Sequence, residues 1–280
     1  MEDKTVRIPA GGVQRQKQED GEIHYLLDCC TDVGICRKVN QDVGCARIFK
    51  TPLHTIVLAA VCDGAGGMEE GEYASRSTIK ALNDWFDYRL NKLVFEKTQK
   101  ELFPAVCGEL KQLICQQNHA VFEYGRQKKI RIGTTLTAML FVDEDYFIAQ
   151  IGDSRAYIVS NGLTQLTEDQ SLVAREVREG RLTEEEARFD KRRNIILQCI
   201  GAAEDLAPDY QSGKVKRGAS YFLCSDGFVH QLDKEEMEAF MDLDELKTID
   251  QMHCRLLWSI ETIKTRGEKD NITVVAVKTW

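Results

Sequence analysis

Short apolar runs, separated by polar turns, recur along most of the chain. They cover residues 23–30, 43–49, 55–63, 134–142, 145–153, 155–160, 221–228 and 270–279. Runs of this length between turn residues are typical of buried strands. Residues 142–147 and the pair Asn161-Gly162 have the polar, turn-forming character of hairpin connections. The pattern therefore predicts strands in hairpin-like groups.

Between these strands, apolar and small residues recur every three or four positions, which is the spacing of one helix face. In the segment 69–90 the positions predicted to face inward are Tyr73, Ala74, Ser77, Thr78, Ala81, Leu82, Trp85 and Phe86. In the segment 97–124 they are Leu102, Val106, Leu110, Leu113 and Val121. The segments 168–192 and 233–264 are highly charged and also helical in pattern.

Because strands come in groups and helices in pairs, the order favours an α+β fold with antiparallel sheets over alternating βαβ units. We expect a β-sandwich flanked by pairs of helices, formed as one domain over residues 22–280. Residues 1–21 are polar and lack periodicity, so we expect a flexible N-terminal extension there.

Charge and cysteine usage narrow the function classes. The formal net charge of −8 argues against nucleic acid as a partner, since phosphate backbones require a basic face. Ten cysteines occur without a CxxC pair, and several lie in apolar runs, as reduced thiols do in cytoplasmic proteins. No apolar run approaches the about 18 residues of a membrane span. We expect a cytoplasmic protein without a membrane partner.

Four aspartates stand at the ends of predicted strands. Asp63 and Asp226 each end a strand and precede a glycine, Asp153 follows another strand, and Asp270 comes just before the last one. A sheet holds such a carboxylate in a fixed place, and a neighbouring glycine leaves room for an ion or a water. Carboxylates without a histidine or cysteine cluster favour Mg²⁺ or Mn²⁺. Two such ions can support an in-line displacement at phosphorus.

An arginine is expected to grip the phosphate in such a site, and Arg37 lies between two predicted strands. Each residue also has a simpler interpretation. An Asp-Gly pair is most often a turn, Arg37 alone would be a surface residue, and Asp153 with Arg155 could form a hairpin ion pair. The joint pattern, rather than any single residue, indicates a metal site.

That joint pattern resembles the metal-dependent Ser/Thr protein phosphatases of the PPM or type 2C family, in their compact bacterial form. Seven pieces occur in family order: TDVGICRKVNQD (31–42), VCDGAGG (61–67), GTTLTAML (133–140), IGDSRAY (151–157), LTEDQSLV (166–173), CSDGF (224–228) and KDNITVV (269–275). Asp-Gly alone is a weak signal, whereas seven ordered pieces over nearly the whole chain are highly specific.

The resemblance implies a four-layer αββα fold with a binuclear metal site at one edge of the sandwich. Asp63 would bridge both ions, the Gly64 carbonyl would bind one of them, and Asp226 and Asp270 would bind the other. Asp42 would orient the metal-bound water, Asn271 would support the site, and Arg37 would bind the substrate phosphate. Asp153 would hold a weaker third metal, and residues from about 171 to 205 would form a flap beside the site.

The implied activity is hydrolysis of phosphoserine and phosphothreonine in proteins by direct attack of a metal-activated water. The expected partners are phosphorylated proteins that a Ser/Thr kinase has modified, and the expected state is a monomer. Three positions depart from the family pattern. Ala65 stands where some members have histidine, Gln41 where an acid is commoner, and Gln170 where histidine is frequent.

Gln41 and Ala65 leave a second hypothesis open, a catalytically weak pseudophosphatase that binds phosphoproteins. A cysteine-dependent phosphatase is disfavoured, because no cysteine has an arginine six positions later. His230 follows Asp226 closely and could approach the site, but the pattern favours a surface position after a strand.

Overall fold

The structure is a computed structural model that describes residues 22–65, 68 and 70–280. Within these residues the strands form two five-stranded sheets, and every strand pair is antiparallel. Sheet A has the order β1 (Tyr25–Asp32), β10 (Ile272–Thr279), β9 (Ser220–Cys224), β6 (Arg155–Val159) and β7 (Leu163–Gln165). Sheet B has the order β2 (Val43–Lys50), β3 (Thr55–Cys62), β4 (Leu136–Val142), β5 (Asp145–Ile151) and β8 (Asp209–Lys214).

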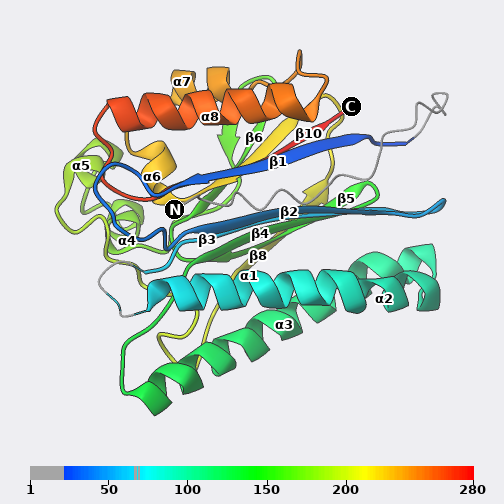
Figure 1. The fold of residues 1–280 in the computed structure, drawn as a ribbon, viewed down its shortest axis with the longest axis horizontal. Coiled ribbons are helices and arrows are strands. Elements are labelled where there is room, and N and C mark those ends of the chain that lie inside the picture. Colours follow the sequence, from blue (N-terminus) through cyan, green and yellow to red (C-terminus); the bar gives the residue numbers. More distant parts are fainter. Residues whose placement is uncertain (1–21, 66–67, 69) are drawn as a thin grey trace.

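Helices cover the outer face of each sheet (Figure 1). On sheet B lie α1 (Gly71–Tyr88), α2 (Leu90–Glu96) and α3 (Gln99–Lys128). On sheet A lie α7 (Lys234–Met241) and α8 (Ile249–Thr265), with the short α6 (Asp226–Val229) at the end of β9. Two short helices, α4 (Leu172–Arg178) and α5 (Glu184–Phe189), occupy the charged segment between β7 and β8.

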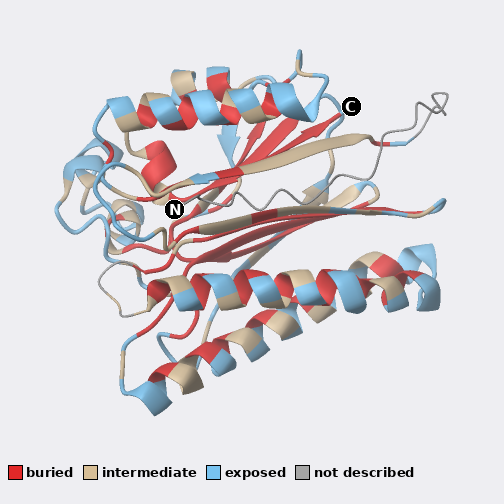
Figure 2. Cartoon of the chain, viewed as in Figure 1, coloured by how far each residue is buried: buried red, intermediate tan, exposed pale blue. Residues whose placement is uncertain are grey.

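Three apolar layers separate these four layers, and β3 shows how its sequence produces two of them. Its side chains alternate in direction, as they do in any strand. Val57, Ala59 and Val61 belong to the core between the two sheets. Ile56, Leu58 and Ala60 belong to the core under α1 and α3. Because both faces are covered, the run is apolar throughout, and Figure 2 shows the inner strands buried along their length.

The predicted fold class, a four-layer αββα sandwich, is confirmed. The predicted helix faces also hold in the main, since Leu82, Trp85, Leu102 and Leu110 are buried. Tyr73 is a correction: it is exposed and stacks on Tyr124 of α3 with ring centroids 3.9 Å apart. Ala74 and Ser75 in the same turn of α1 are buried, so Tyr73 lies on a different face of the helix, where it meets α3.

Four elements were not predicted: α2, α6, β7 and β8. The strand predicted over 221–228 ends at Cys224, and helix α6 begins at Asp226. The charged segment 168–192 contains two short helices rather than one long one. The flexible extension that the sequence predicts for residues 1–21 lies outside the described part of the chain. No helix in the described part is both long and apolar enough to cross a membrane.

Candidate metal centre and phosphate site

The aspartates singled out from the sequence lie at one end of the sandwich. In sheet B the end of β3 pairs with the start of β4, and Leu136 at that start pairs with Ile151 at the end of β5. In sheet A Cys224, which ends β9, pairs with both Val274 near the start of β10 and Arg155 at the start of β6. We call the aspartates that follow or precede these strand ends, together with the nearby Asp42, the acidic edge; its members are Asp42, Asp63, Asp153, Asp226 and Asp270.

Two threonines hold Asp63 just after β3. The backbone N–H of Asp63 donates to Thr135 Oγ1 at 2.9 Å, and its carbonyl accepts from the Thr135 N–H and the Thr134 hydroxyl, both at 2.8 Å. Three bonds to one residue fix the direction in which its side chain leaves the sheet. Burial and the nearby charges of Asp42 and Asp226 raise the pKa of Asp63 well above its usual range.

Asp42 is buried with one oxygen unsatisfied. Its Oδ2 accepts a 2.7 Å hydrogen bond from the Ser225 hydroxyl, whereas Oδ1 has no partner in the described structure. Burial raises the pKa of Asp42 to about 7, and the carboxylates of Asp226 and Asp270 add to this rise. An orphaned buried carboxylate oxygen is costly unless a proton or a cation meets it.

Asp153 repeats this arrangement in the connection between β5 and β6. It is 7% exposed, its Oδ1 has no partner in the described structure, and burial followed by the charges of Asp226 and Asp169 raises its pKa to about 8. The connection crosses from sheet B to sheet A, so the hairpin ion pair with Arg155 is wrong. Arg155 instead binds Asp169, with guanidinium nitrogens 2.6–3.0 Å from the carboxylate oxygens.

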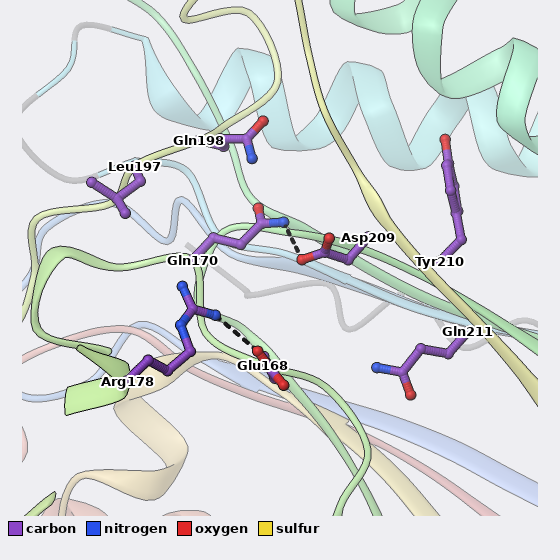
Figure 3. A pocket seen from close by; sticks show the side chains of 8 residues that line it. All are labelled: Glu168, Gln170, Arg178, Leu197, Gln198, Asp209, Tyr210 and Gln211. Carbon is purple, nitrogen blue, oxygen red and sulfur yellow. Dashed lines mark hydrogen bonds and ion pairs between the residues drawn. The ribbon is translucent and has the colours of Figure 1, made fainter. Parts of the chain in front are cut away.

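Gln170, whose role the sequence left open, supports the Asp153 connection. Its Oε1 accepts from the Gly152 N–H at 2.9 Å, and its backbone N–H donates to the Gly152 carbonyl, also at 2.9 Å. Its Nε2 donates to Asp209 Oδ2 on β8 at 2.7 Å (Figure 3). Gln170 therefore ties the loop that carries Asp153 to the edge strand of sheet B.

Asp226 begins α6, and a histidine on the same turn approaches it. His230 Nε2 lies 3.6 Å from Asp226 Oδ2, and His230 Nδ1 lies 3.4 Å from Glu268 Oε2. Burial lowers the pKa of His230, but the two carboxylates outweigh this effect and raise it. Burial also raises the pKa of Asp226, and Asp270 and Glu268 add to it. The expected surface position of His230 is therefore wrong.

Arg37 comes from the loop between β1 and β2 and reaches Asp270 across the site. Its Nη2 lies 2.7 Å from Asp270 Oδ2, and the side chain is 42% exposed. The hydrogen bond to Asp270, followed by the charges of Asp270, Asp63 and Asp226, raises the pKa of Arg37. The guanidinium thus faces the acidic edge while remaining accessible from outside.

Asn271 holds the loop that carries Arg37. Its Oδ1 accepts from the Gln41 N–H at 2.9 Å, and its Nδ2 donates to the carbonyls of Val33 at 2.9 Å and Val39 at 3.3 Å. Gln41 also accepts at its carbonyl from the Gly64 N–H at 3.1 Å. One buried amide thereby connects the start of β10, the Arg37 loop and the turn after β3.

Sequence reasoning missed the residues that support these side chains. Ser225 stands beside Asp226 and Glu268 two positions before Asp270, and that adjacency was the available signal, whereas Thr134 and Thr135 lie 71 and 72 positions from Asp63 and offered none. The partner of Ser225 is distant in sequence too, since Ser225 and Asp42 are 183 positions apart. Such contacts depend on the sheet register, which no local pattern reveals.

The donor set of the acidic edge fits divalent metal ions. It contains only oxygen, it gathers carboxylates whose pKa values rise through burial and mutual repulsion, and two of them have an orphaned oxygen. Such oxygen sets suit Mg²⁺ and Mn²⁺. Within the described residues, however, this edge does not bring three ligand atoms within 4.8 Å of one another.

A hollow of about 480 Å³ lies next to the Asp153 connection (Figure 3). The segment before and within α4 forms one wall with Glu168, Gln170 and Arg178, and β8 forms the other with Asp209 and Tyr210. Arg178 donates to Glu168 at 2.8 Å, so part of the lining is an ion pair. The hollow is polar and open, and Asp153 is not among the residues that line it.

The comparisons with known proteins agree with this geometry. The family model described as "Protein phosphatase 2C" matches residues 38–256. A relative from Streptococcus pyogenes, "Putative protein phosphatase 2C-type", is 31% identical over 88% of this chain and 94% of its own length. The solved serine/threonine phosphatase of S. agalactiae is 30% identical, with a TM-score of 0.76 over 91% of this chain and 99% of that one.

A further solved structure, the catalytic domain of the serine/threonine protein phosphatase PstP, is described as a complex with two manganese ions. It is 26% identical, with a TM-score of 0.71, and the match covers 92% of this chain and 99% of that one. The family resemblance predicted from the seven motifs is confirmed by the family model and these relatives. The chain belongs to the protein phosphatase 2C family of serine/threonine protein phosphatases.

Proposed function

We propose that the chain hydrolyses phosphoserine and phosphothreonine in proteins at a binuclear Mg²⁺ or Mn²⁺ centre on the acidic edge. The observation that carries this proposal is the set of buried carboxylates, two with an orphaned oxygen, that faces the arginine Arg37. The relatives named as phosphatases add support, and they give none to the pseudophosphatase alternative.

In this proposal Asp63, the Gly64 carbonyl, Asp226 and Asp270 would hold the two ions, with Asp63 contributing to both. Asp153 would hold a weaker third ion. When bound, the ions would supply a water of lowered pKa as nucleophile and positive charge for the phosphate oxygens. The PstP complex with two manganese ions is the comparison that supports two ions here.

The chain's own residues bind and orient the substrate. Arg37 would hold the phosphate through its planar guanidinium, and its exposed position suits a group that arrives from solvent. Asp42, with Oδ2 held by Ser225, would orient the attacking water through its unpartnered Oδ1. Asn271 would keep Arg37 at the right distance by holding its loop.

The substrate class follows from the openness of the site. Arg37 and the hollow beside Gln170 lie at the surface, so a phosphorylated segment of a folded protein can reach them. We propose that residues 171–205 act as a flap that influences which proteins bind, and that the substrates are products of a Ser/Thr kinase.

All ten cysteines lie in the described residues and are free thiols, which supports a reducing, cytoplasmic setting. We also propose that residues 22–280 form one domain and that the protein is a monomer.

Hydrolysis assays with three phosphopeptides test this function. Phosphothreonine and phosphoserine peptides should be hydrolysed in the presence of Mn²⁺. Hydrolysis should fall below detection in EDTA and return when Mn²⁺ is restored. A phosphotyrosine peptide of the same sequence is the matched control for substrate class. Binding of the phosphothreonine peptide without turnover at saturating Mn²⁺ would refute the proposal and favour a binding module.

A further inference from the structure

A second group of metal-ligating side chains lies away from the acidic edge, between sheet A and α8. Asp28 and Cys30 are two residues apart on β1, so both point to the same face of the sheet. Helix α8 covers that face, and it contributes His253 (Figure 1). Within the described part of the chain, this is the one group of three such residues whose ligand atoms all lie within 4.8 Å of one another.

The three side chains converge on one ring nitrogen. His253 Nδ1 lies 2.8 Å from Asp28 Oδ2 and 3.4 Å from Cys30 Sγ, and Sγ lies 4.0 Å from Oδ2. A nucleophilic Cys–His–Asp arrangement would place the thiol and the carboxylate on different ring nitrogens. Here both meet Nδ1, which can donate to one or accept from the other but cannot do both.

A cation at the centre of the group would accept a lone pair from each of the three atoms. Tetrahedral Zn²⁺ bonds of about 2.0–2.3 Å place N, O and S ligand atoms about 3.3–3.6 Å apart. The 3.4 Å separation of Sγ and Nδ1 already fits. The other two separations, 2.8 and 4.0 Å, each need a change of about half an ångström, which side-chain rotation supplies.

The donor types select a different ion from that of the acidic edge. A thiolate and an imidazole suit Zn²⁺ and related transition ions, whereas oxygen-only sets suit Mg²⁺ and Mn²⁺. Cys30 is 2% exposed, but the side chains of Asp28 and His253 are 18% and 23% exposed, so an ion can enter from solvent. Three protein ligands leave a fourth position for water.

We propose that Asp28, Cys30 and His253 bind one Zn²⁺-type ion that links α8 to β1. On binding, the Cys30 thiol loses its proton to solvent, and the resulting thiolate becomes the sulfur ligand. The ion joins a helix and a strand that are otherwise held mainly by apolar packing. It is separate from the metals of the proposed phosphatase centre, in which no cysteine takes part.

Cobalt binding tests this proposal, because a thiolate ligand to Co²⁺ gives a near-ultraviolet charge-transfer absorption that oxygen ligands do not. The full chain should show this absorption on titration with Co²⁺. Cys30→Ser should abolish it, and His253→Gln should weaken Zn²⁺ binding by about tenfold or more, since even changes outside the ligand set cost about 10–100-fold. Zn²⁺ should also raise the melting temperature of the wild type by more than that of His253→Gln, whose acidic edge can still bind the ion.

Cys254→Ser and Cys36→Ser are matched controls, since both thiols are exposed and lie beside His253 and Arg37 in sequence. Both variants should retain the cobalt absorption. Asp226→Asn should retain it as well, which separates this site from the phosphatase centre. No thiolate absorption in the folded wild type at saturating Co²⁺, or an unchanged one in both Cys30→Ser and His253→Gln, would show that the group is only a hydrogen-bonded link between helix and strand.

Discussion

The guanidinium of Arg37 lies 2.7 Å from the carboxylate of Asp270, although 233 positions separate the two residues in the sequence. The contact joins the residue proposed to bind phosphate to a residue proposed to bind metal. The loop between β1 and β2 therefore lies against the start of β10, and this contact fixes the phosphate-binding residue relative to the metal-binding one.

Replacing Arg37 by lysine should separate phosphate binding from metal binding. Lysine keeps the charge but loses the planar pair of donors. Because a hydrogen bond to a charged group contributes about 1.5–3 kcal/mol, kcat/KM for a phosphothreonine peptide should fall about 10- to 100-fold. Mn²⁺ affinity, measured by calorimetry, should change little. Lys38→Ala in the same exposed loop is the control and should leave kcat/KM unchanged.

Gly34→Ala should disturb the site by a backbone collision. Gly34 has φ +74°, and a Cβ there would collide with the Asp270 carbonyl. Gly180 has nearly the same φ of +71° but open space around it, so Gly180→Ala measures the backbone cost alone, about 1–2 kcal/mol. Gly34→Ala should lose more stability than this in a denaturant titration, and it should also lose Mn²⁺ affinity. Equal losses in the two variants would argue against the collision.

Gln170→Ala should destabilise the connection that carries Asp153. The change removes the acceptor of the buried Gly152 N–H, and leaving such a group unpaired costs about 1–3 kcal/mol. Chemical denaturation measures this loss. Gln211→Ala is the matched control, since Gln211 lines the same hollow but is exposed, and its effect should stay within about 0.5 kcal/mol.

The buried Asp42 makes stability depend on pH when metal is removed. Its folded pKa of about 7 lies above the unfolded value of 3.8, so the folded state binds the proton more tightly. Below about pH 4 the carboxyl is protonated in both the folded and the unfolded protein, so its contribution to stability is fully present. As pH rises from about 4 through about 7, the unfolded state releases this proton first, and stability is lost. In EDTA, Asp42→Asn should therefore gain stability over the wild type between pH 5 and 8, of the order of 3 kcal/mol.

Thermal melts of both proteins across this pH range measure the effect. A constant difference between them would mean that Asp42 is ionised throughout this pH range, and the raised pKa of Asp42 would then be wrong.

The sequence predicted the layers and the aspartates better than it predicted the contacts between them. The apolar runs of β3 and β10 are covered on both faces, so their strand character is visible in composition alone. β8 is a polar edge strand, and it is a strand because it pairs with β5 rather than because of its own residues. Its existence depends on tertiary structure.

The same limit applies to the candidate site. The aspartates stand at strand ends, where a local pattern places them. The bond of Ser225 to Asp42, the ion pair of Arg37 with Asp270 and the support of Asp63 by Thr135 join residues 183, 233 and 72 positions apart. These are long-range geometric facts, and a single sequence gives no measure of them.

The central claim is that the acidic edge holds the metal ions on which turnover depends. Asp226→Asn tests it most directly, with Asp145→Asn as control, because Asp145 lies at the opposite end of β5 from Asp153 and pairs with Lys214. We would measure Mn²⁺ binding by calorimetry and phosphothreonine-peptide hydrolysis on the same samples. Loss of both in Asp226→Asn, with both retained in Asp145→Asn, is the predicted result. Full turnover and unchanged Mn²⁺ binding in folded Asp226→Asn would contradict the account.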